Sequence, residues 1–153
     1  MNTPTSNSAD TILRIRDLRV TFTSEEGEVG AVNGVSLDLQ RKRVLAIVGE
    51  SGCGKSVTSY SILRLIRKPG KITCGSIEYT PDDGRPPVDI VALGEKDDRL
   101  FQVRGGDISM IFQEPMSALS PVHTVGNQIC EAILLHQDVT PEQARERAIE
   151  MLR

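Results

Sequence analysis

The octapeptide at residues 49–56 constrains the fold of this chain more than any other feature. It reads Gly-Glu-Ser-Gly-Cys-Gly-Lys-Ser and satisfies the pattern G-x-x-x-x-G-K-[ST], between an apolar run and a helical stretch. Its glycines allow the backbone to curl so that consecutive N–H groups point into one concavity, which suits phosphate oxygens. A helix that begins near Lys55 adds the positive end of its dipole. The pattern therefore predicts a loop that binds the phosphates of a nucleotide.

Every residue of this loop is a candidate ligand of ATP, and Ser56 is in addition a candidate ligand of Mg²⁺. Lys55 would place its charge on the β- and γ-phosphates, and the Ser56 hydroxyl would join the shell of Mg²⁺. The candidate nucleotide-binding residues are Gly49, Glu50, Ser51, Gly52, Cys53, Gly54, Lys55 and Ser56. Cys53 is open to two interpretations. It is either a small filler side chain or a site of oxidation or alkylation that bound ATP would block.

Composition narrows the class of protein. The 153 residues suffice for one compact domain, and 39% hydrophobic with 25% charged residues is ordinary for a globular chain. A net charge of −3 gives no electrostatic footprint for nucleic acid. The longest apolar run, Val44–Val48, is far shorter than the roughly 20 residues of a membrane-spanning helix. The three cysteines and two histidines form no metal-ligand pattern.

Alternating apolar residues predict an antiparallel hairpin ahead of the loop. Leu13 and Ile15 alternate with arginines, and Leu18 and Val20 continue in the opposite phase, so a bulge is expected at Arg16-Asp17. Residues 23–30 are expected to form a turn or short loop, and 35–39 a second half-exposed strand.

The rest of the chain alternates between strands and helices. Residues 44–48 are apolar at every position, which predicts a strand buried on both faces, and 108–112 predict another apolar strand. Further strands are expected at 72–79 and 88–93. Helices are expected from the loop to about residue 68, at 95–103 and at 125–136. Thr140, Pro141 and Gln143 predict the capped start of a last helix, with Ala144, Ala148, Met151 and Leu152 as its buried stripe.

A second signature, in residues 104–129, resembles a known family. The stretch DISMIFQEPMSALSPVHTVGNQI looks like the Q-loop region of the ATP-binding subunits of ABC importers, in particular the dipeptide, oligopeptide and nickel uptake group. The octapeptide, GKITCGSIEY and DIVALGEKD follow the order and spacing of that family. The resemblance covers 12–153, with small departures at Ala118, Ser120 and the turn at 82–87.

The resemblance implies an α/β fold, with a P-loop NTPase core of the ABC type, an antiparallel β subdomain, and truncation before Walker B. It divides the chain into a flexible tail at 1–11, the core and β subdomain at 12–115, and the start of a helical subdomain at about 116–153.

The same resemblance assigns three further roles. Phe22 would be the aromatic residue that stacks on adenine; the alternative is a core residue of the hairpin. Gln113 would reach Mg²⁺ and the attacking water, which makes it a catalytic residue together with Lys55; the alternative is an ordinary residue at a strand end. Residues 114–125 would line the groove for a coupling helix of the permease. A Walker B interpretation of 108–112 is rejected, because Gln113 stands where that strand needs Asp.

The implied function is to energise the uptake of di- and oligopeptides across the cytoplasmic membrane. The partners would be two transmembrane permease subunits, a second ATP-binding subunit (identical or paralogous) and an extracytoplasmic substrate-binding protein. The subunit would lie on the cytoplasmic side of the inner membrane as a peripheral protein. Alternatives are import of nickel or another small solute, a small-molecule kinase, and a non-hydrolysing nucleotide-binding module.

Hydrolysis requires groups on both sides of the γ-phosphate. In this family the Walker B strand, its catalytic glutamate, the signature sequence and the switch histidine lie downstream of the position of Arg153. We therefore expect the 153-residue chain to bind ATP or ADP with negligible turnover.

Overall fold

The computed structural model describes residues 10–113 and 119–153, which fall into two compact units. The first unit ends at Asp97, and the second runs from Asp98 to Arg153. The tail predicted at 1–11 lies almost entirely outside the described residues, and Thr11 already belongs to the first strand.

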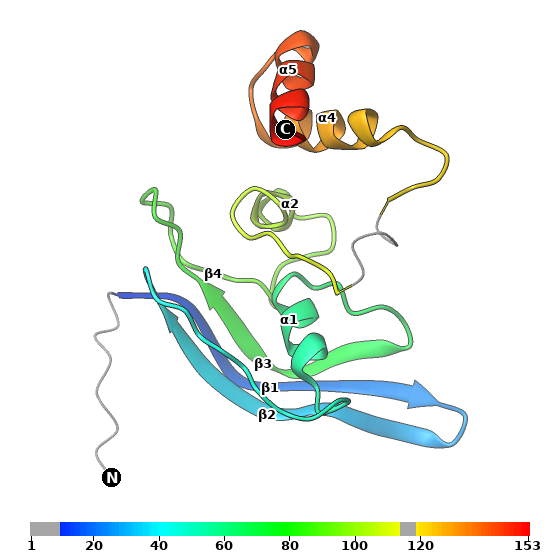
Figure 1. The fold of residues 1–153 in the computed structure, drawn as a ribbon. Helices are drawn as coiled ribbons and strands as arrows, with labels where there is room; N and C mark the ends of the chain where they lie inside the picture. The colour runs from blue at the N-terminus through cyan, green and yellow to red at the C-terminus, as the bar shows by residue number, and fades with distance from the viewer. Residues whose placement is uncertain (1–9, 114–118) are drawn as a thin grey trace. The chain divides into compact units, whose positions relative to one another are not determined.

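The first unit contains a four-stranded antiparallel sheet of order β2-β1-β3-β4 (Figure 1). Its strands are β1 (Thr11–Ser24), β2 (Gly27–Gln40), β3 (Gly70–Tyr79) and β4 (Val88–Asp89). The predicted hairpin is confirmed as the β1–β2 pair. Its turn is tighter than expected, because residues 27–30 of the predicted loop pair with β1 as part of β2.

The predicted bulge in β1 is confirmed. Asp17 adopts a φ of 44°, and the pairing with both β2 and β3 shifts register at this place. Because one extra residue restores the phase, Leu13 and Ile15 before the bulge and Leu18 and Val20 after it are all buried. Ile77 and Tyr79 of β3 join them in the core of the unit.

The opposite face of the sheet is charged. Arg16 donates from Nη2 to Oδ2 of Asp38 on β2 over 2.9 Å, and Nη1 of Arg14 lies 3.3 Å from the Glu78 carboxylate on β3. The hydrogen bond from Arg16 holds the pKa of Asp38 below its ordinary value. The sheet thus has one dry and one wet face, as expected of an antiparallel sheet.

Helix α1 (Lys55–Ile62) follows the octapeptide and ends earlier than the sequence pattern suggests. Leu63 is its C-cap, and Arg64 turns the chain with a φ of 49°. The expectation of a helix to about residue 68 is wrong. Leu63 enters the buried core, and the Arg64 guanidinium donates to the carbonyl of Leu93, so tertiary contacts end the helix.

The strands expected at 44–48 and 108–112 were predicted wrongly. Residues 44–48 and 109–112 have no strand conformation, and the only parallel pairing among the described residues is the isolated bridge Arg104–Ile108. Val44 is 97% and Ile111 95% exposed. A strand buried on both faces needs a neighbour on each side and a layer above and below, and the described residues supply none. The strand predicted at 88–93 is likewise reduced to the two residues of β4.

The second unit consists of helices α2 (Asp98–Val103), α4 (Val125–His136) and α5 (Pro141–Met151). The prediction for α4 is confirmed residue for residue, and α2 falls within its predicted range. Thr140 and Gln143 form the expected capping box of α5.

Ile133 of α4 packs with Ala144 and Ala148 of α5. The predicted stripe is wrong at its end, because Met151 and Leu152 are exposed.

No helix in residues 10–113 and 119–153 combines the length and apolar character that crossing a membrane requires.

Candidate functional site

The octapeptide forms a curled loop between β2 and the start of α1. Gly52 and Gly54 adopt φ angles of 80° and 91°, in the left-handed region that other residues avoid. The amide of Cys53 donates to the carbonyl of Glu50 over 3.5 Å, which closes a turn inside the loop. The curl expected from the glycines is therefore present.

The ammonium of Lys55 lies inside this curl. Its Nζ donates to the carbonyls of Gly49 at 2.8 Å and Glu50 at 2.5 Å, and lies 3.4 Å from the Cys53 sulfur. An ammonium has three donors and no acceptor, so the loop's own atoms take all three. Phosphate oxygens that enter the curl would replace these neutral acceptors with charged ones, which form stronger hydrogen bonds.

The first turn of α1 leaves its amide groups open to an anion. Gly54 is the N-cap residue, no side chain caps the helix, and its first turn contains no acidic residue. The N–H groups of a first helical turn have no partners within the helix, and they attract negative charge. Gly54, Lys55 and Ser56 stand at this helix start, so the site fits the phosphate chain of a nucleotide.

A magnesium ion also fits the donor set. Among the described residues, no group of three His, Cys, Asp or Glu side chains could hold a metal. Mg²⁺ in phosphate-transfer sites is typically held by one or two protein oxygens together with the phosphates. The exposed Ser56 hydroxyl, one residue into α1, offers such an oxygen.

Two residues that contact the loop and fix its end were not predicted from the sequence. The buried Thr58 donates to the Gly54 carbonyl from its amide at 2.9 Å and from its hydroxyl at 3.0 Å. On the other side, the Ala31 carbonyl of β2 stands so close that a Cβ added to Gly54 would lie 2.4 Å from it. Thr58 could have been found as a threonine four residues after Gly54 in a helix. Nothing in the sequence marks Ala31.

Phe22 lies near the end of β1 in the same unit as the loop. Its ring is half-buried and meets Gly70, where an added Cβ would come within 2.5 Å of Cε1 and 2.7 Å of the Ile66 side chain. These contacts suit a ring that is partly a core residue. Its role in stacking on adenine remains a prediction.

Gln113 belongs to the second unit, where its side chain is exposed. The structure brings the residues of the octapeptide together in the first unit, and the joining of Gln113 to them remains a prediction.

The segment predicted to contact a permease, 114–125, falls only in part within the described residues, since 114–118 lie outside them. In the remainder, Leu119, Val122 and Val125 are exposed apolar side chains. The side-chain amide of Gln128 on α4 fixes this backbone, because it accepts from the Ser120 amide at 2.9 Å and donates to the carbonyls of Ser120 and His123.

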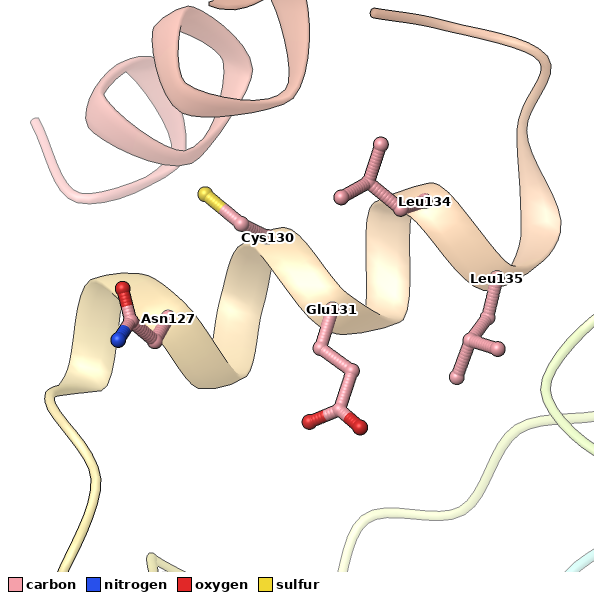
Figure 2. Close-up of a pocket in the computed structure, with 5 residues that line it drawn as sticks. All are labelled: Asn127, Cys130, Glu131, Leu134 and Leu135. Carbon is pink, nitrogen blue, oxygen red and sulfur yellow. The ribbon is translucent and has the colours of Figure 1, made fainter. Parts of the chain in front are cut away.

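An open pocket lies on α4 itself (Figure 2). It is lined by Asn127, Cys130, Glu131, Leu134 and Leu135. Cys130 and Leu134 point to the side of the helix on which α5 lies, whereas Glu131 and Leu135 point to the other side. The pocket has few polar atoms to orient a small molecule, so the octapeptide remains the stronger candidate site.

Comparison with known proteins gives one consistent family. The family model described as "ABC transporter" matches residues 32–153. The chain is 46% identical over its whole length to the probable peptide ABC transporter ATP-binding protein y4tR of Sinorhizobium fredii, and it covers 44% of that protein. It is also 46% identical, over 92% of its length, to the dipeptide transport ATP-binding protein DppD of Bacillus subtilis, of which it covers 40%. The chain thus spans less than half the length of these curated relatives.

Among solved structures of other proteins, the chain is similar to the ATP-binding cassette MJ0796 bound to ADP and Pi. The superposition has a TM-score of 0.73 at 24% identity and covers 92% of this chain and 55% of the cassette. This likeness shows the fold of an ATP-binding cassette. The fold class predicted from the sequence is confirmed.

Proposed function

Since the chain belongs to the ABC transporter family, we propose that it is the ATP-binding part of an importer subunit that energises the uptake of di- and oligopeptides. The observation that carries the proposal is the curled loop at the uncapped start of α1, with the Lys55 ammonium inside it. The names of its relatives, which are peptide and dipeptide transport ATP-binding proteins, support peptides as the cargo.

Residues of this chain would bind and orient the nucleotide. The amides around Gly54 and the Lys55 ammonium hold the phosphates, and the ring of Phe22 stacks on the base. Ser56 and Gln113 offer oxygens to Mg²⁺, which when bound would neutralise phosphate charge. The neutral amide of Gln113 can orient a water molecule without acting as a base.

Hydrolysis would need groups that these 153 residues do not contain. No apolar run after Lys55 is followed by Asp-Glu, so the sequence lacks the acidic pair at a strand end that would hold Mg²⁺ and position water. We therefore infer that the chain alone binds ATP with negligible turnover, and that hydrolysis belongs to the longer protein and its dimer partner.

The whole transporter would contain two permease subunits, a second ATP-binding subunit and an extracytoplasmic substrate-binding protein. The ATP-binding subunit would lie on the cytoplasmic face of the inner membrane. The exposed Leu119, Val122 and Val125, on a backbone that Gln128 holds, support contact between the second unit and a permease helix.

Uptake by cells tests the cargo directly. The substitution Lys55→Ala would be made in the gene that encodes these residues, with Lys96→Ala, an exposed lysine outside the loop, as the matched control. We expect Lys55→Ala to abolish uptake of labelled di- and tetrapeptides and Lys96→Ala to retain it. Loss of nickel uptake alone would establish the alternative cargo, and unchanged uptake of both would contradict the proposal.

A further inference from the structure

Strand β2 contains a bulge beside the phosphate-binding loop. Val20 of β1 pairs with Val32, but the next residue, Thr21, pairs with Gly30, so Ala31 is an extra residue on β2. The pairing of β1 with β3 is regular at Val20, Thr21 and Phe22, and the irregularity therefore belongs to β2. A bulge bends its strand and re-aims groups there, and bulges are over-represented next to active sites.

The bulged residue is the part of the sheet that meets the loop. A Cβ on Gly54 would lie 2.4 Å from the Ala31 carbonyl oxygen and 3.5 Å from Cγ2 of Val32. From the other side, the amide and hydroxyl of Thr58 donate to the Gly54 carbonyl at 2.9 and 3.0 Å. Gly54 is thus enclosed between the bulge and α1, at the point where the loop becomes the helix.

The same short stretch of the β1–β2 pairing includes Phe22, whose ring is proposed to stack on the adenine base. Phe22 pairs with Val29, the next pair along after Thr21 and Gly30. Its ring is fixed against Gly70 of β3 and Ile66. The bulge, the loop residue that meets it and this ring are thus all attached to one short stretch of the sheet.

We infer that the Ala31 bulge is a positioning element that sets the phosphate-binding loop at the distance from Phe22 that a nucleotide spans. The inference rests on the proposed function, since it assumes that loop and ring hold the two ends of one ATP. Ala31 acts through its main-chain carbonyl and touches neither base nor phosphate in this account.

The register allows the bulge to be removed cleanly. Deletion of Ala31 leaves Val32 paired with Val20 and Gly30 with Thr21, so the pairs on both sides are kept in a regular ladder. Deletion of Gly34 is the matched control. It removes the other extra residue of β2, between the pairs Leu18–Val35 and Arg19–Asn33, and Gly34 has the side chains of Asp17 and Arg19 as neighbours instead of the loop.

The test compares two probes by calorimetry on the 153-residue chain. Mg-ATP requires both loop and ring, whereas tripolyphosphate requires the loop alone. We expect deletion of Ala31 to weaken ATP binding by about tenfold, the worth of a stacked base, and to change tripolyphosphate binding by less than about threefold. Deletion of Gly34 should leave the ratio of the two affinities unchanged, even if it lowers the unfolding temperature.

A purely structural bulge would lower both affinities together or neither, and that result would overturn the inference. If the unaltered chain binds neither probe, the proposed function is refuted and the inference falls with it. Equal changes of the two affinities on deletion of Ala31 would refute the inference alone, so the two failures are distinguishable.

If the chain with Ala31 deleted does not fold, hydrogen exchange on the unaltered chain tests the inference instead. ATP should slow exchange of the amides at 30–32 more than tripolyphosphate does, whereas equal or absent slowing would contradict the inference.

Discussion

The phosphate-binding loop is held firmly where it runs into α1, whereas residues 42–48, which lead from the end of β2 to the loop, are exposed. At the α1 end, Gly54 lies between Thr58 and Ala31, and Thr58 is 4% exposed. At the β2 end, Val44 and Val48 are 97% and 88% exposed, although they belong to the most apolar run in the sequence.

This difference shows that an apolar sequence is not by itself sufficient for burial. The hydroxyl and amide of Thr58 donate to the carbonyl of Gly54, the N-cap residue four positions back, so that end is fixed by local hydrogen bonds. Residues 44–48 would gain from burial only against other strands and a covering layer. Lys55 connects the two ends, because it belongs to α1 and donates to the carbonyls of Gly49 and Glu50.

Removal of that connection should have the largest effect. Lys55→Ala deletes a charge and three donors, and each charge-assisted bond to phosphate contributes about 1.5–3 kcal/mol, so we expect ATP affinity to fall by about 100-fold or more. Phe22→Ala should weaken binding by only about tenfold, because stacking contributes about 1–3 kcal/mol. Titration with a fluorescent ATP analogue measures both. Equal losses would contradict this ranking, and Lys96→Ala serves as the control.

A polar substitution in each apolar run measures the difference in burial. Val20→Thr places a hydroxyl in a core where Val20 is fully buried, and it should lower the free energy of unfolding by about 1–3 kcal/mol. Val44→Thr changes an exposed side chain and should stay within about 0.5 kcal/mol. Urea denaturation of the two variants gives the values. A large loss in Val44→Thr would show that residues 44–48 are covered in solution.

The two loop glycines separate backbone strain from the contact with β2. Gly52 and Gly54 both have positive φ, but an added Cβ meets nothing at Gly52 and meets Ala31 at Gly54. Gly52→Ala should lower the free energy of unfolding by about 1–2 kcal/mol through strain alone. Gly54→Ala should lower it by about a further 1 kcal/mol or more through overpacking. Similar losses in thermal unfolding would mean that β2 does not hold the loop.

A stabilising substitution is available in the exposed segment 42–48. Lys42 has a φ of 55° in the exposed turn that follows β2. Lys42→Gly should raise the free energy of unfolding by up to about 1 kcal/mol, since glycine adopts this conformation without strain. Arg43→Gly, at the next residue, has no such strain to relieve and should lower stability slightly. Differential scanning calorimetry of the pair would detect a shift of opposite sign, and a loss in both would contradict the assignment of strain.

Local patterns predicted the elements whose stabilising contacts are local or regular. The change of phase around Arg16-Asp17 identified the bulge in β1, and the spacing of Thr140 and Gln143 identified the cap of α5. The glycine spacing predicted the curl of the loop. In each case a short stretch of sequence contains the physical cause, whether alternation, capping or backbone freedom.

The wrong predictions concern segments whose structure depends on distant partners. The apolar content of 44–48 and 108–112 was taken for burial, but burial depends on neighbouring strands that the segments themselves do not encode. The early end of α1 depends on the contact of Arg64 with Leu93, and the bulge at Ala31 depends on β1 and Gly54. Main-chain contacts of this kind leave no side-chain pattern to detect.

The central claim is that the loop at residues 49–56 binds the phosphates of a nucleotide. Isothermal titration of the folded 153-residue chain with Mg-ATP tests it most directly. We predict one saturable site of roughly micromolar affinity, which corresponds to about 8 kcal/mol, and loss of that heat in Lys55→Ala. A chain that unfolds cooperatively on heating, yet gives no binding heat with Mg-ATP or Mg-ADP, would contradict the account.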